Sequence, residues 1–110
     1  MPELDIPKLV RDILGATEPI LKKAYEEAKP YLESEARKLG EAATLIAKLK
    51  LENKISETKA RLLMGMQKTA MQNVLLAIEG IGLVTAEMAI NAAVGVVKDT
   101  VNKFIGWNVL

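Results

Sequence analysis

The sequence contains neither cysteine nor histidine. Without cysteine, the chain has no disulfide, no thiolate metal site and no cysteine nucleophile. Without histidine, it lacks the commonest general acid–base group, the usual transition-metal ligand and the ordinary switch near neutral pH. The sequence therefore predicts no catalytic residue, no metal site and no cofactor. We expect a protein that is not an enzyme.

Aromatic residues, proline and glycine are also scarce: one Trp, two Tyr, one Phe, four Pro and seven Gly in 110 residues. The apolar residues are mainly Ala, Leu, Ile, Val and Met, and no segment alternates apolar and polar residues as a strand would. We therefore expect an all-α fold in a single helical domain, 1–110. It comprises a charged amphipathic half, 1–68, and an apolar half rich in Gly and Ala, 69–110.

Charges of the two signs nearly balance, with 15 Lys and Arg against 14 Asp and Glu. This balance argues against a nucleic-acid partner, which normally requires a basic excess. No glycine-rich phosphate loop follows a strand, so no small-molecule substrate is expected. The acidic N-terminal segment has no apolar core, so we expect no signal peptide. The predicted location is the cytoplasm or an assembled particle, with a membrane as the alternative.

Helix signals divide the N-terminal half into two helices. Asp5 is placed to cap a short helix over residues 6–14, which Gly15 is expected to end. Thr17 is the predicted N-cap of a long amphipathic helix with a charged outer face. Its apolar stripe keeps its phase across Pro30, so we expect a kinked helix that continues through the proline.

A chain reversal is expected near Asn53, which suits a left-handed position, with Ser56 as the next N-cap. A return helix then extends over 57–105 in pattern. Two glycines in Gly80–Gly82 cost roughly 2 kcal/mol in a helix interior, so the return helix is expected to bend or break there. Gly106 is the predicted C-cap.

The stretch from Thr69 to Val97 carries only two charged residues, Glu79 and Glu87. A helix of this composition must be buried in a partner, in the chain's other half or in lipid. Small residues on one face favour close backbone approach, either between copies of the chain or against alanines of the long second helix. The predicted packing residues are Gly82, Ala86, Ala89 and Ala93, with Gly95 beside them.

Three polar residues interrupt this apolar stretch: Glu79, Glu87 and Asn91. The two carboxylates are two helical turns apart, about 12 Å, which is too far to share a proton or a metal within one helix. We expect these three residues to form buried polar contacts between helices.

Four methionines, Met64, Met66, Met71 and Met88, are expected to be mainly core residues. Met64 and Met66 cannot share one helix face, so one of them should meet a second partner.

Two interpretations of the apolar segment remain open. Residues 74–97 are long enough to cross a lipid core of about 30 Å, but the acidic residues oppose insertion. The leading hypothesis is a non-enzymatic structural or assembly subunit that binds itself or another helical subunit through its C-terminal helix. A minor component of a virus or phage particle is one setting for it. The alternative is a membrane-associated helical protein with residues 74–97 in lipid.

Overall fold

The computed structural model describes residues 3–110, which form four α-helices and a short 3₁₀ turn. The elements are α1 (Ile6–Leu21), η1 (Lys22–Ala24), α2 (Tyr25–Leu51), α3 (Glu57–Leu76) and α4 (Leu83–Ile105). No strand occurs in this part of the chain, so the predicted all-α class is confirmed.

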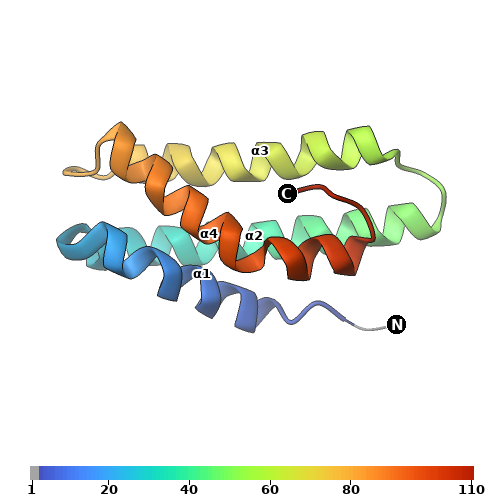
Figure 1. The fold of residues 1–110 in the computed structure, drawn as a ribbon, viewed down its shortest axis with the longest axis horizontal. Helices are drawn as coiled ribbons and strands as arrows, with labels where there is room; N and C mark the ends of the chain where they lie inside the picture. Colours follow the sequence, from blue (N-terminus) through green and yellow to red (C-terminus); the bar gives the residue numbers. More distant parts are fainter. Residues whose placement is uncertain (1–2) are drawn as a thin grey trace.

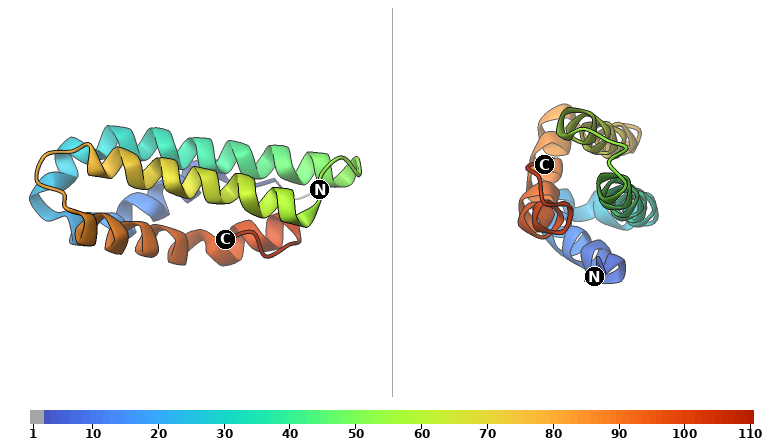
Figure 2. Two further views of the ribbon diagram at one scale, coloured as in Figure 1. Left: turned by 90° about the horizontal axis from the view of Figure 1, so that it is seen from above. Right: turned by 90° about the vertical axis from the view of Figure 1, so that its right-hand side faces the viewer.

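Successive helices run in opposite directions along one elongated bundle of 44 × 23 × 18 Å (Figure 1). Viewed down the long axis, the helices surround a shared core in the order α1, α2, α3, α4 (Figure 2). The most extensive packing joins α4 to α1, which closes the ring. The core is built from aliphatic side chains of all four helices, with Tyr25 the one aromatic among its fully buried members.

The first helix is longer than the sequence signals indicate. It continues through Gly15 to Leu21, so its predicted end at residue 14 is wrong. Thr17, the predicted N-cap, is a fully buried interior residue whose Oγ1 donates to the carbonyl oxygen of Ile13 at 2.9 Å. A helical glycine costs only about 1 kcal/mol, and burial of Leu9, Ile13 and Leu21 on one face outweighs that cost.

The second helix continues through Pro30, as predicted. The chain reverses between α1 and α2 at Lys22, which has a left-handed φ of 52°. This boundary lies later than the one predicted near residue 15. Gly40 provides close packing with α1, because a Cβ added there would lie 3.0 Å from Cγ1 of Ile6. The glycine therefore lets the start of α1 rest directly against the backbone of α2.

The reversal between α2 and α3 is confirmed where it was predicted. Asn53 adopts a left-handed φ of 57°. Ser56 Oγ accepts a hydrogen bond from the amide of Lys59 at 3.1 Å and caps α3. Gly106, with a φ of 85°, ends α4 as expected.

The return segment is two antiparallel helices, not a single bent one. α3 ends at Leu76, and residues 77–82 reverse the chain before α4 begins, with Gly80 at a φ of 89° (Figure 1). The break divides residues 74–97, so that stretch is not one continuous helix. In the described part of the chain, no helix combines the length and apolar character that a membrane span requires.

Candidate interaction surface

The predicted stripe of small residues divides between the two faces of α4. Ala86, Ala89 and Ala93 are buried inside the chain's own bundle, on the side that packs against its neighbouring helices. Gly82 and Gly95 are exposed, and a Cβ added at either would meet no atom within 4 Å. The alanines therefore serve packing inside the chain. As a whole, α4 packs more extensively against α1 than against α2, the helix that the sequence offered as the alternative to self-association.

The predicted buried polar residues are on the surface of the chain. Glu79 lies in the turn between α3 and α4, while Glu87 and Asn91 lie on the outside of α4, and all three are exposed. None of them forms a side-chain hydrogen bond or ion pair among residues 3–110. They therefore form no buried contact within residues 3–110. A contact between chains stays a prediction.

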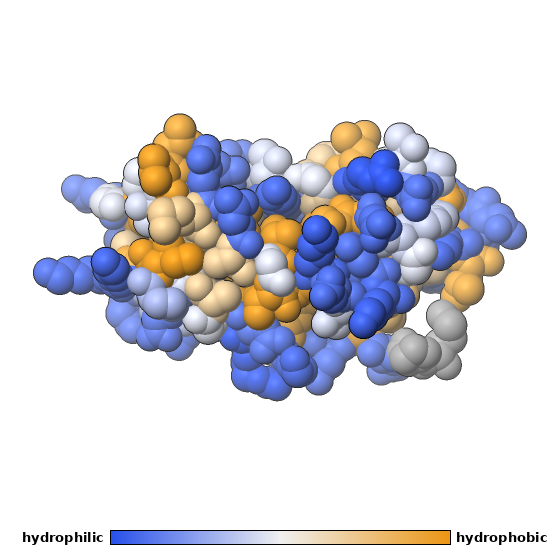
Figure 3. Space-filling model, viewed as in Figure 1, coloured by the Kyte–Doolittle hydropathy of each residue, from blue (hydrophilic) through white to orange (hydrophobic). Residues whose placement is uncertain are grey.

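The outer face of α4 is an exposed apolar surface. Large aliphatic side chains are in water there, with Val84 at 70% and Met88 at 53% of full exposure. We define this outer face by the residues on the side opposite the buried alanines: Val84, Met88, Asn91, Ala92, Gly95 and Val96. Figure 3 shows apolar surface gathered along the path of the N-terminal half of α4, bordered by hydrophilic residues. Exposed apolar patches of this kind mark interaction sites.

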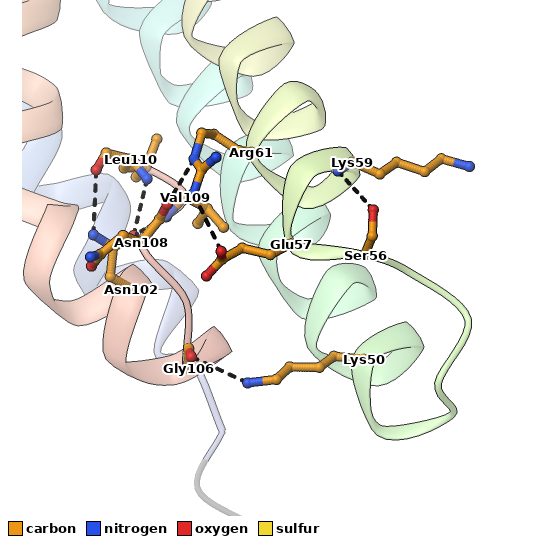
Figure 4. Close-up of polar contacts among 10 residues, drawn as sticks. All are labelled: Lys50, Ser56, Glu57, Lys59, Arg61, Asn102, Gly106, Asn108, Val109 and Leu110. Atoms are coloured by element: carbon orange, nitrogen blue, oxygen red, sulfur yellow. Dashed lines mark hydrogen bonds and ion pairs between the residues drawn. The ribbon is translucent and has the colours of Figure 1, made fainter.

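The C-terminal end of the same face is covered by the chain itself. Residues 106–110 fold back between α3 and α4 (Figure 4). The Asn102 side-chain oxygen accepts hydrogen bonds from the amides of Val109 and Leu110, each at 3.0 Å. Arg61 Nε of α3 donates to the carbonyl oxygen of Asn108 at 3.2 Å. The tail thus protects the last turns of α4 and leaves the first turns bare.

The same tail is also fixed from α2. Lys50 Nζ donates to the carbonyl oxygens of Ile105 at 3.0 Å and Gly106 at 3.3 Å. It also lies 4.5 Å from the centroid of the Trp107 ring, a cation–π contact. The tail is therefore held at its start by α2 and at its end by α3 and α4.

The methionines divide in the same way as the small residues. Met64 and Met71 are buried, whereas Met66 and Met88 are exposed. Met64 and Met66 are thus on opposite sides of α3, as their spacing predicted. Met66, with Leu62, belongs to an outer face of α3.

No group of three or more acidic side chains among residues 3–110 is placed to hold a metal ion. Burial raises the pKa of Tyr25 above its ordinary value near 10, and the carboxylates of Glu18, Glu26 and Glu33 raise it further. The folded state therefore holds this proton more tightly, and stability falls as the pH rises above about 10.

Comparison with protein-family models, with curated proteins and with solved structures found no match. Inference about function therefore depends on the surfaces themselves.

Sequence reasoning did not separate the exposed apolar residues of α3 and α4 from the buried ones. Val84, Val96 and Leu62 are all exposed. A signal was present in the spacing, because Leu62 lies two residues from Met64 and hence roughly 200° away around the helix. Nothing in the sequence placed the C-terminal tail against Asn102.

Proposed function

We propose that this chain is a non-enzymatic assembly subunit that self-associates through the outer face of α4. The observation that carries the proposal is the exposure of Val84 and Met88 on a helix face that bears no Lys or Arg before Lys98. Exposing such side chains costs free energy that burial against another surface recovers, at roughly 25 cal/mol per Å². A minor component of a virus or phage particle is one setting compatible with such a subunit.

Gly95 adds a separate argument. It lies inside α4, where glycine costs about 1 kcal/mol relative to alanine. Within the chain nothing occupies the space that an alanine side chain would take. Internal packing therefore gives no reason for glycine at this position. Close approach of a second backbone would explain the glycine, because the missing Cβ lets two helices pack at short distance.

The test compares two substitutions at equally exposed positions. Met88 on α4 and Leu45 on α2 are 53% and 54% exposed. We expect Met88→Asp to reduce the mass in solution from a multiple of 12.0 kDa to 12.0 kDa itself. Leu45→Asp, which introduces the same charge elsewhere, should leave the oligomer unchanged. Sedimentation velocity without detergent, with circular dichroism to verify folding, measures both.

A wild-type chain that sediments as a monomer at micromolar concentration would contradict self-association. An oligomer that survives Met88→Asp and Val84→Asp but is lost in Leu45→Asp would place the interface on α2.

A further inference from the structure

The outer face of α3 is a second exposed apolar surface, separate from that of α4. Leu62 is 65% exposed and Met66 is 59% exposed. They border a shallow groove of about 740 Å³. The residues that line it all belong to α3: Thr58, Arg61, Leu62, Gly65, Met66, Thr69, Ala70 and Asn73. The opposite side of α3 holds the buried Met64 and Met71, so the bundle keeps α3 folded with this face outward.

Positive charge predominates around this face, with Glu57 at the start of α3 as an acidic exception. From Thr58 to Ile78 the chain has no Asp or Glu, although the whole sequence has 14. The charged residues in that stretch are Lys59, Arg61 and Lys68. Helical spacing puts Lys59 on one side of Leu62 and the other two on its other side. Exposed apolar side chains with Lys or Arg on either side are one feature of a helix that lies in a membrane interface.

Two of the three cations are free to meet an external anion. Among residues 3–110, neither Lys59 nor Lys68 forms an ion pair, whereas Arg61 lies 3.5 Å from a carboxylate oxygen of Glu57. Figure 4 shows the Lys59 side chain extending away from the bundle, while its backbone amide donates to the capping oxygen of Ser56. The free charge therefore lies beside the exposed apolar side chains.

We infer that α3 attaches the protein to the surface of an anionic lipid bilayer. Leu62 and Met66 enter the interface, and Lys59 and Lys68 contact the headgroups. A second copy fits this face poorly, because two-fold pairing would bring the cations of both chains together, and the acidic residue of α3, Glu57, is already paired with Arg61. A partner helix normally enters a groove between elements, whereas this one is formed on a single outward helix. A flat bilayer surface can contact a helix face that points outward from the bundle in this way.

Vesicle binding tests the inference. We expect the full chain to co-float with vesicles of phosphatidylcholine containing about one third phosphatidylglycerol, at least about ten-fold more strongly than with pure phosphatidylcholine. Leu62→Asp should weaken this binding about ten-fold or more. Lys59→Gln and Lys68→Gln should each weaken it about five-fold, since each removes one surface cation. Raising the salt should weaken the wild type further.

Matched variants on α2 complete the experiment. Leu45→Asp and Lys29→Gln change exposed residues in the same way, and both should bind vesicles as the wild type does. Leu62→Asp should leave the sedimentation mass unchanged, which separates this inference from self-association through α4. Equal binding to neutral vesicles, no binding to anionic vesicles, or unchanged binding by Leu62→Asp and Lys59→Gln would each overturn it. Capture of an acidic helix by α3, without vesicle binding, would overturn it as well.

Discussion

The two faces of α4 have similar chemistry and opposite environments. The inner face presents Ala86, Ala89 and Ala93, which are buried, while the outer face presents Val84 and Gly95, which are exposed. The inner face also buries the large side chain of Ile90, and the outer face also carries the polar Asn91, so neither side-chain size nor apolar character alone separates the two faces. The difference is that other helices of the bundle cover the inner face, whereas nothing in the chain covers the outer face near Val84.

A second contrast divides the outer face itself. Its C-terminal end is covered by residues 106–110 through Asn102, and its N-terminal end around Met88 is bare. The chain thus has a segment able to cover this face and places it over one end only. We propose that another molecule binds the exposed N-terminal end of this face.

The largest expected loss of stability comes from shortening a buried side chain on the inner face of α4. Ile90→Ala removes a side chain that is almost fully buried and should lower the free energy of unfolding by about 2–5 kcal/mol. Val96→Ala, on the exposed side, should lower it by less than about 0.5 kcal/mol. Urea denaturation measures both. Equal losses would mean that the outer face is also part of the folded core.

Overfilling the inner face should have the next largest effect. Ala89→Leu introduces bulk where α4 packs within the bundle and should cost about 1–3 kcal/mol of stability. Ala92→Leu, toward the outside, should change stability little. Thermal unfolding compares the two variants. If Ala89→Leu changed only the oligomeric mass and not the melting temperature, the inner stripe would be an interface between chains.

Removal of the tail anchor should have an intermediate effect. Asn102→Ala deletes the acceptor for the Val109 and Leu110 amides and should cost about 1–2 kcal/mol. The matched change is Asn91→Ala on the same face, which makes no side-chain hydrogen bond in the described residues and should leave the protection of the tail amides unchanged. Hydrogen exchange at the tail amides reports the difference. Unchanged protection in Asn102→Ala would show that the tail is held by its apolar contacts alone.

The smallest expected change in stability comes from a glycine on the outer face of α4, and it tests both folding and self-association. Gly95→Ala should raise stability by up to about 1 kcal/mol and at the same time weaken self-association, since the new Cβ separates the two backbones. Gly15→Ala, at an equally open position in α1, should raise stability and leave association unchanged. Denaturation and sedimentation of the same two proteins give both quantities. A more tightly associated Gly95→Ala variant would exclude close backbone contact there.

Local signals were sufficient for several elements of the fold. The turn at Asn53, the cap at Ser56 and the C-cap at Gly106 follow from backbone preferences of single residues, and the structure confirms them. The helix through Pro30 followed from an apolar stripe that stayed in phase. Each of these depends on neighbours within about one or two turns.

Other elements depended on contacts distant in sequence. Gly15 and Thr17 resemble an end and a start of helices, yet both lie inside α1, because the packing of Ile13 and Leu21 favours one continuous helix. Gly80 indicated an interruption but not its angle, and the chain reverses there so that α4 reaches α1. Because of this reversal, the segment predicted as one bent or broken return helix forms two helices, α3 and α4.

The sequence by itself determined that the chain is helical and where two of its turns lie. These properties follow from composition, spacing and local backbone preference. Only the tertiary structure decided which face of α4 is buried and that Glu87 and Asn91 are exposed to solvent. It also decided that the tail covers one end of the outer face. The reason is geometric: helical spacing groups residues into faces, but only packing among helices distant in sequence determines which face turns inward.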